Sequence, residues 1–368
     1  MHEIDDKVDR LARLAASRGL GGILINTQPS FAWLTGGRSN QIDGSRETGS
    51  GSLLVGAAGQ RFVVANNIEM PRLQEEALTG LGFTPCEYAW TREQENPGTA
   101  VATARQAVCG EIGCDAPLAG GTLIDSAVIA ARALLTPPEV DRYRALGRDL
   151  GAIIGEVCRG IAPHLTEIEI AQRVAAAVSC IGARAIVTLV AADDRMARFR
   201  HPAPTSKPWR AQVMVVVCAQ RHGLVAALSR IIVNGAIPAD LERRTAATAS
   251  VFAALIAGTR AGATGADLFG AAAKAYAAAG FPSEETRHHQ GGATGYRSRE
   301  WIAHPASRET VQARQAFAWN PSITGTKVEE TTLVTDAGFE VITASPAWPA
   351  IPVGVNGTTL SAPGILAL

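Results

Sequence analysis

Two neighbouring histidines, followed by an amide and two glycines, form the most unusual short stretch of this sequence, His288-His289-Gln290-Gly291-Gly292. Imidazoles transfer protons near neutral pH, and an amide can hold a polar substrate or fix a histidine tautomer. Neighbouring side chains of a strand point to opposite faces, so we expect one histidine in a pocket and the other outside. The glycines let a ligand approach the backbone closely. The stretch therefore predicts polar recognition and proton transfer, with a turn that carries surface histidines as the alternative.

Two further side chains have the chemistry of a general acid or base. His201 carries an imidazole that can take a proton from water or a thiol at working pH. Glu329 lies next to apolar Val328 and near Leu333, which would desolvate its carboxylate and suit it to a general acid or base. Each has a structural alternative: His201 could be a loop residue packed against Pro202, and Glu329 could form an ion pair with Arg230.

Polar and charged residues alternate after the glycines, at Tyr296, Arg297, Arg299 and Glu300. A strand would place the two arginines on one face, opposite Tyr296 and Glu300. An arginine inside a pocket binds a carboxylate through two parallel hydrogen bonds, so this pattern predicts an anchor for an acidic substrate. A solvated row of charges is the alternative.

Cys218 ends an apolar run and is a candidate for contact with a substrate. A thiol beside a histidine could act as a nucleophile, but a cysteine in an apolar strand more often belongs to an inert core. The six cysteines of the chain have no dense spacing, which is typical of reduced thiols and not of a disulfide scaffold.

The elements that must position these residues alternate between helix and strand, which predicts an α/β (α+β) chain. Apolar spacing predicts a first helix around residues 8–14, a buried strand at 22–26 and a second strand at 31–37. Two short strands at 52–55 and 61–64 would form a hairpin. A helical segment at 70–78 and a strand near 110–112 complete this part.

Two prolines after Thr136 predict a boundary between domains at 1–135 and 136–368, because a helix cannot run through them. A helix should follow from Glu139 to about Gly160. Thr166 and Glu169 form a capping-box signature for the next helix. The rest of the prediction comprises paired strands at 213–218 and 224–233, joined by a turn at 221–223, and Ala-rich helices at 239–257 and 265–279.

The composition excludes several classes of function. Lys and Arg together number 34, as do Asp and Glu, so no net charge attracts nucleic acid or anionic lipid. The first residues lack the features of a signal peptide, and the apolar runs are shorter than the ~20 residues that span a bilayer. We therefore expect a cytoplasmic protein that binds a small molecule, without nucleic-acid or membrane partners.

Segments 216–230, 287–300, 317–321 and 327–335 resemble, in order and spacing, those of the creatinase, aminopeptidase P, prolidase and methionine aminopeptidase superfamily. FAWLTGGRSNQID, at 31–43, is similar to part of the N-terminal domain of these proteins. The resemblance implies a ribonuclease-H-like, creatinase-type domain at 1–135 and a pita-bread domain at 136–368. It also implies a homodimer.

The resemblance indicates where members of the superfamily hold two metal ions. Two Asp, one His and two Glu of those members correspond here to Val216, Ala227, Gly292, Asn320 and Glu329. Two cations that share a bridging water need hard oxygen ligands, and one carboxylate at five points cannot supply them. We therefore expect neither a metal nor another cofactor.

Creatinase is the subfamily closest in kind, since it hydrolyses a C–N bond without a metal. Its pocket histidine, the general base, matches His201. Its carboxylates that clamp a guanidinium group would fall at Ser229 and Asn320, so creatine is not the expected substrate. Arg230 matches an arginine of the same family strand.

The sequence thus predicts a metal-independent hydrolase that cleaves a C–N bond of a small polar, nitrogen-containing substrate. His201 would be the main base, and His289 and Glu329 would share proton transfer. The residues expected to bind the substrate are His288, Gln290, Tyr296, Arg297, Arg299, Asn320, Arg230 and Cys218. Two alternatives stay open: a non-catalytic protein that binds a peptide or partner protein, and a conventional Xaa-Pro aminopeptidase or dipeptidase with an altered metal site.

Overall fold

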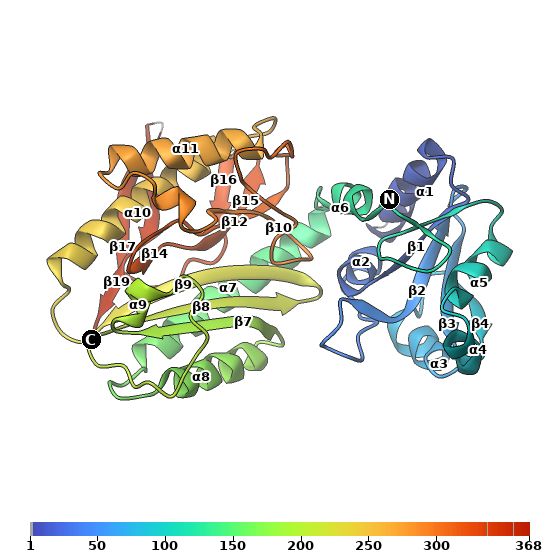
Figure 1. The fold of residues 1–368 in the computed structure, drawn as a ribbon, viewed down its shortest axis with the longest axis horizontal. Helices are drawn as coiled ribbons and strands as arrows, with labels where there is room; N and C mark the ends of the chain where they lie inside the picture. Colours follow the sequence, from blue (N-terminus) through green and yellow to red (C-terminus); the bar gives the residue numbers. More distant parts are fainter. Residues whose placement is uncertain (1–2, 337, 356) are drawn as a thin grey trace. The chain divides into compact units, whose positions relative to one another are not determined.

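A computed structural model describes residues 3–336, 338–355 and 357–368 of the chain (Figure 1). The chain divides into two compact units, Met1–Glu139 and Val140–Leu368. Within the described residues, no helix combines the length and the apolar character needed to cross a membrane.

The first unit is built on a six-stranded sheet with the order β4-β3-β2-β1-β5-β6. Strand β1 pairs antiparallel with β2 and parallel with β5. Helices α1 and α2 pack against β1 and β2, whereas α5 packs against β3 and β4. The strands are β1 (Gly22–Thr27), β2 (Thr48–Gly56), β3 (Arg61–Asn66), β4 (Thr84–Tyr88), β5 (Ile112–Cys114) and β6 (Thr122–Leu123). The helices are α1 (Glu3–Ser17), α2 (Gln28–Leu34), α3 (Met70–Arg72) with a π-turn at Leu73–Ala77, α4 (Trp90–Glu95), α5 (Thr99–Ala107) and α6 (Asp125–Arg132).

The strand predicted at 31–37 is wrong, because residues 28–34 form helix α2. Thr27 caps this helix: its side-chain oxygen accepts a hydrogen bond from the backbone N–H of Ser30 at 3.3 Å. Pro29 lies in the first turn, where its missing donor costs nothing. The apolar run that suggested a strand is the fully buried face of this short helix. The predicted hairpin at 52–55 and 61–64 is confirmed.

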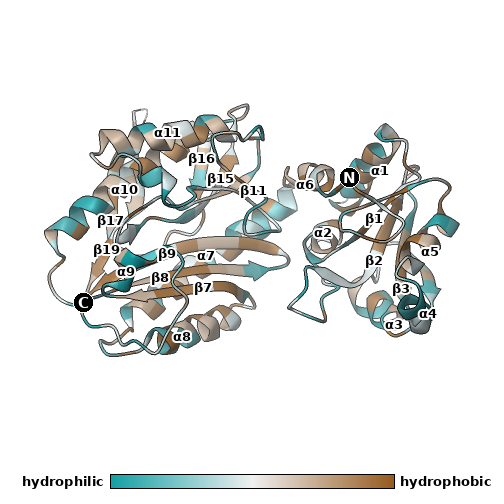
Figure 2. Cartoon of the chain, in the orientation of Figure 1, coloured by the Kyte–Doolittle hydropathy of each residue, from teal (hydrophilic) through white to brown (hydrophobic). Residues whose placement is uncertain are grey.

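The second unit contains a four-stranded sheet, β19-β9-β8-β7, and a five-stranded sheet, β11-β10-β12-β15-β16. The long strands β7, β8 and β9 are largely apolar (Figure 2). The first sheet comprises β7 (Arg184–Ala192), β8 (Gln212–Arg221), β9 (Leu224–Val233) and β19 (Ile365–Ala367); the second comprises β10 (Gly291–Thr294), β11 (Trp301–Ile302), β12 (Ala316–Trp319), β15 (Glu330–Thr335) and β16 (Gly338–Val341). Two further sheets have two strands each. One pairs β13 (Ser322–Ile323) with β14 (Thr326–Lys327), and the other pairs β17 (Ala350–Val355) with β18 (Thr358–Pro363).

Helices surround these sheets, and α8 packs against β7 while α10 packs against α11 and β17. They are α7 (Pro137–Arg159), α8 (Glu167–Cys180), α9 (Arg195–Arg198), α10 (Ala239–Gly258) and α11 (Gly265–Ala278). The predicted capping box is confirmed, since Thr166 Oγ1 accepts from the N–H of Glu169 at 3.2 Å and the Glu169 carboxylate accepts in return at 2.7 Å. The β8–β9 hairpin is also confirmed: it turns at His222 and Gly223, whose φ angles of 52° and 78° suit a tight turn.

The two sheets of the second unit meet where β9 lies beside the start of β15. The backbone N–H of Ser229 donates to the carbonyl of Glu329 at 3.2 Å, and that of Ala227 donates to Thr331 Oγ1 at 2.7 Å. This junction places residues 227–229 beside residues 329–331, which lie about a hundred positions later in the chain. The candidate site lies at the same junction.

Candidate functional site

A cavity of about 280 Å³ lies in the second unit at the junction of its two sheets. One wall is apolar and comes from paired residues of β7 and β8: Val187 lies opposite Cys218, and Leu189 opposite Val216. The remaining lining is polar, and consists of His201, His289, Ser298, Arg299, Asn320, Lys327 and Glu329. An amphipathic cavity of this kind suits a small molecule that has one apolar side and several polar groups.

Cys218 belongs to the apolar wall. Burial, reinforced by the nearby carboxylate of Glu329, raises the pKa of its thiol to about 12. Only the thiolate is a competent nucleophile, so the thiol is inert near neutral pH. The raised pKa disfavours the nucleophile alternative for Cys218, whereas the predicted place of this residue at the cavity is present.

Charged groups face one another across the polar part of the cavity. Arg299 Nη2 lies 3.2 Å from Glu329 Oε1, and both side chains are largely buried. The ammonium of Lys327 is also buried, and within the described residues no hydrogen bond or ion pair reaches it. Burial lowers the pKa of Lys327, because desolvation disfavours the ammonium form, while Glu329 partly offsets this effect. The cavity lining thus contains two basic side chains, Arg299 and Lys327, and one carboxylate, Glu329.

Several buried polar atoms of this cavity have no hydrogen-bond partner in the described part of the chain. They are His289 Nδ1, Arg299 Nε, Asn320 Oδ1 and Glu329 Oε2. Buried polar groups of a folded protein nearly always have a protein or water partner. These atoms therefore mark the places where a substrate or ordered water would bond.

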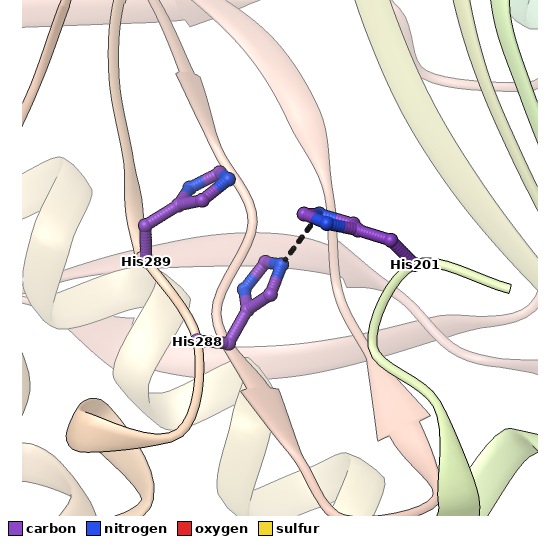
Figure 3. A group of neighbouring side chains, drawn as sticks. All are labelled: His201, His288 and His289. Atoms are coloured by element: carbon purple, nitrogen blue, oxygen red, sulfur yellow. Dashed lines mark hydrogen bonds between the residues drawn. The ribbon is translucent and has the colours of Figure 1, made fainter.

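Three histidines form a cluster at the polar end of the cavity (Figure 3). Nε2 of His201 and Nε2 of His288 are 3.0 Å apart, which is hydrogen-bonding distance. The rings of His288 and His289 stack with centroids 4.4 Å apart, and the His289 ring points toward His201. His201 is exposed, whereas His288 is buried and His289 is half-buried.

The cluster is uncharged near neutral pH. Burial lowers the pKa of His288 to about 2, assisted by the charge of Lys327. Burial, followed by the charge of Arg299, lowers the pKa of His289 to about 4. The pKa of His201 is lowered for the same principal reason, although Glu329 opposes the shift. Each uncharged ring has one nitrogen that carries a proton and one that offers a lone pair, and in the bond between His201 and His288 one of these lone pairs accepts.

The expectation that one of the two adjacent histidines points outward is wrong. Residues 288 and 289 precede strand β10, so the alternation of a strand does not apply to them. Both rings turn towards His201 (Figure 3). His289 lines the cavity, whereas His288 contacts the His201 ring and is not part of the lining.

The loop that carries His201 is held on one side by a partly buried ion pair and on the other by hydrogen bonds to a buried carboxylate. The Arg200 guanidinium lies 2.5 Å from Glu284 and donates to Thr324 Oγ1 at 3.0 Å. Further along, the buried carboxylate of Glu167 accepts from the backbone N–H of Thr205 at 2.8 Å. The position of the His201 ring is thus set by the fold on which it sits.

Gln290, a predicted substrate-binding residue, does not line the cavity, and protein groups take up its amide. Its Oε1 accepts a hydrogen bond from the hydroxyl of Tyr276 at 2.7 Å, and its Nε2 donates to the carbonyl of His288. The side chain is fully buried and does not line the cavity. Its role is to hold the backbone from which the two histidines project.

The strand alternation predicted for residues 296–300 is wrong, because β10 ends at Thr294 and a turn follows. The carboxylate of Glu300 closes this turn by accepting from the backbone N–H groups of Tyr296 and Arg297, at 3.1 and 3.3 Å. Of the predicted residues in this stretch, Arg299 lines the cavity, whereas Tyr296 and Arg297 do not.

Arg230 is a structural residue and not part of the cavity. Its guanidinium lies 2.9 Å from Glu330 and donates to Ser345 Oγ at 2.8 Å and to the carbonyl of Thr343 at 3.0 Å. The predicted alternative, an ion pair between Arg230 and Glu329, is wrong because Glu330 takes that place. Burial raises the pKa of Glu330 to about 7, although Arg230 opposes the shift.

Lys327 and Ser298 line the cavity but were not predicted from the sequence. Lys327 stands two residues before Glu329, so extended backbone places the two side chains on the same face. This two-residue spacing was the feature of the sequence that could have identified Lys327 as a cavity residue. A lysine between Thr326 and Val328 is also typical of an ordinary edge-strand charge, so the spacing alone did not select it.

The five points that hold two metal ions in related proteins do not fit such a centre here. Val216, Ala227 and Gly292 carry no donor atom, and only Asn320 and Glu329 offer side-chain oxygen. A Cβ at position 292 would lie 2.1 Å from the carbonyl oxygen of Trp301, so this backbone excludes any side chain there. Val216, Asn320 and Glu329 nevertheless line one cavity, as the predicted register requires.

These features define a two-domain protein of pita-bread type, with a cavity between the two sheets of the second domain. The sequence pattern of Metallopeptidase family M24 matches residues 141–336, and the chain belongs to this family. The predicted membership of the creatinase, aminopeptidase P and prolidase superfamily is thereby confirmed.

Solved structures with the same fold cover nearly the whole chain. A dipeptidase from Mycobacterium ulcerans superposes with a TM-score of 0.79 at 18% identity, over 100% of this chain and 98% of that chain. An Xaa-Pro dipeptidase from Bacillus anthracis gives 0.78 at 18% identity, over 99% and 100%. The N-terminal domain of the FACT complex subunit SPT16 from Cicer arietinum (chickpea) gives 0.71 at 10% identity, over 93% and 96%. No curated protein sequence matches this chain.

Proposed function

We propose that this protein hydrolyses a C–N bond of a small, carboxylate-bearing substrate, and that it does so without the two-metal centre of its family. The observation that carries the proposal is the arrangement of charge in the cavity, where Glu329 lies beside Arg299 and beside Lys327, whose ammonium has no hydrogen-bond or ion-pair partner in the described part of the chain. A dry cationic pair of this kind favours an anion, through charge-assisted hydrogen bonds.

The cations serve two purposes in this proposal. The buried ammonium of Lys327 binds the carboxylate of the substrate or stabilises the oxyanion that forms at the carbon under attack. Arg299 holds one oxygen of Glu329 and so orients the other, Oε2, towards the cavity, where it has no partner in the described residues. The apolar wall that contains Val216 and Leu189 accommodates the remainder of a small substrate.

The histidines and Glu329 move the proton. His201 is uncharged and exposed to the cavity mouth, so it can take a proton from water as the water oxygen bonds to the substrate carbon. The C–N bond then breaks, and the leaving nitrogen takes up that proton from His201 or through His289 and Glu329. In the bond between His201 and His288 one ring donates and the other accepts, so His288 positions His201 by fixing its tautomer.

A panel of guanidino, ureido, lactam and Xaa-Pro compounds, assayed with and without a chelator, tests this proposal. We expect turnover of at least one carboxylate-bearing member, and a chelator should not lower it. His201→Ala should lower kcat by about 10²–10⁴-fold. The matched control is His304→Ala, an exposed histidine outside the cavity. Full turnover by His201→Ala would remove the proposed base.

A second candidate, an Xaa-Pro dipeptidase, is favoured by the likeness to the Bacillus anthracis enzyme of that name. A dipeptide also carries the carboxylate that the cations select. Turnover confined to Xaa-Pro dipeptides would favour this candidate. Inertness towards the whole panel would favour a binding protein instead, and a homodimer in the cytoplasm stays a prediction for sedimentation and cell-fractionation measurements.

A further inference from the structure

We propose that His201, His288 and His289 together bind one divalent transition-metal ion of the zinc type. The site is distinct from the two-metal pattern of the family, since none of these residues stands at the five corresponding points. Its existence does not depend on the proposed hydrolysis.

The distances between the imidazoles approach those of a three-histidine site. One ligand nitrogen from each ring can be chosen so that all three lie within 4.8 Å of one another. In a tetrahedral site with Zn–N bonds of about 2.05 Å, two ligand nitrogens are roughly 3.3 Å apart. The His201 and His288 nitrogens, 3.0 Å apart, already have nearly this separation. The largest distance between two of the ligand nitrogens, at most 4.8 Å, has to shorten by about 1.5 Å to reach the tetrahedral value. A rotation of one imidazole side chain provides this.

The surrounding structure prepares these rings as ligands. Nδ1 of His288 and Nδ1 of His289 are buried and have no hydrogen-bond partner among the described residues, so no protein group engages these two nitrogens. The fold holds them in place independently of any ion: Arg200 anchors the loop of His201, and Gln290 anchors the backbone of the other two. Metal ligands that are oriented in this way by their neighbours bind more tightly than free side chains.

The chemistry of the donors indicates which ion would bind. Three nitrogens and no carboxylate among them favour zinc, cobalt, nickel or copper, and disfavour magnesium and calcium, which need oxygen ligands. His201 is exposed and gives the ion a path from solvent. Arg299 and Lys327 line the same cavity and oppose a dication, whereas Glu329 partly offsets their charge.

Binding at this cluster would also affect the reaction. A metal ion on His201 occupies the lone pair with which this residue takes its proton, so one bound zinc should inhibit the proposed hydrolysis. The cluster would then couple turnover to the concentration of a transition metal, in contrast to the activating metals of a two-metal peptidase. This consequence rests on the proposed function, whereas the binding itself does not.

The test is a titration of the full-length, chelator-treated protein with zinc by calorimetry, and with cobalt(II) by visible absorption, which reports the coordination geometry. Exposed Cys109 and Cys180 could hold zinc, so the thiols are alkylated first. We expect one ion per chain. His201→Ala and His289→Ala should each weaken binding by about tenfold or more, whereas His304→Ala should leave it unchanged.

Circular dichroism and thermal melts establish that each variant is folded, and His201 is the more decisive position because it is exposed. The proposal is overturned by an absence of stoichiometric zinc or cobalt binding, or by equal affinity in the His201 and His304 variants. Failure of hydrolysis in the substrate panel leaves these outcomes intact, so the two proposals fail separately.

Discussion

Replacing Lys327 by methionine should make the protein more stable and less active at the same time. The side chain is 5% exposed, and its ammonium has no ion-pair or hydrogen-bond partner among the described residues. A buried polar group left without a partner costs about 1–3 kcal/mol. Methionine fills a similar volume without that cost, so Lys327→Met should raise the free energy of unfolding by an amount in this range.

The effect on the melting temperature follows from the size of the domain. For 150–250 residues, about 1 kcal/mol shifts the Tm by roughly 2–4 °C. The pH dependence has a definite sign. Because the pKa of Lys327 is lowered in the folded state, the unfolded chain binds more protons, and the penalty is present at neutral pH. It diminishes as the pH rises through the folded-state pKa towards the ordinary value of 10.5, so the gain from Lys327→Met should shrink at alkaline pH.

The same change should weaken binding of an anionic substrate. A hydrogen bond to a charged group contributes about 1.5–3 kcal/mol, which corresponds to roughly 10–150-fold in kcat/KM. Urea unfolding and steady-state kinetics measure the two effects, and Lys274→Met, at an exposed position of α11, is the matched control. A variant that loses stability, or one that keeps full kcat/KM, would refute the reasoning that Lys327 is a buried, functional cation.

Three other changes test the structural assignments. Arg230→Met leaves a buried carboxylate without its partner and should cost about 3–5 kcal/mol in urea unfolding; a loss below ~1 kcal/mol would contradict the buried ion pair. Iodoacetamide at pH 8 should label exposed Cys109 well before Cys218, whose thiol is buried with a raised pKa; mass spectrometry of the labelled peptides decides between them. Gly292→Ala should destabilise the protein by about 1–3 kcal/mol, since the new methyl group meets a carbonyl, whereas Gly270→Ala, in a helix with open space, should not; equal melting temperatures would be evidence against the close packing.

Local signals were sufficient to predict much of the fold. The capping box at Thr166, the β8–β9 hairpin and the two Ala-rich helices each follow from residues within one segment. The helix at 28–34 was predicted as a strand because its apolar residues are all buried, which removes the periodicity that separates the two structures. Its cap, Thr27, was the local signal that could have corrected the prediction.

The candidate site was predictable where the family spacing applied. That spacing brought Val216, Asn320 and Glu329 to one cavity, and His201 and Arg299 line it as well. Other assignments needed three-dimensional contacts. The sequence could not show that the Gln290 amide bonds to Tyr276 and to the backbone. Nor could it show that Arg230 forms its ion pair with Glu330 and not with Glu329.

The measurement that bears most directly on the central claim is the hydrolytic activity of the chelator-treated protein, combined with its metal content. We expect an active protein without stoichiometric manganese, cobalt or zinc, in which Arg299 and Lys327 supply the positive charge of the site. Activity that is lost on chelation and restored by two equivalents of metal per chain would contradict this mechanism.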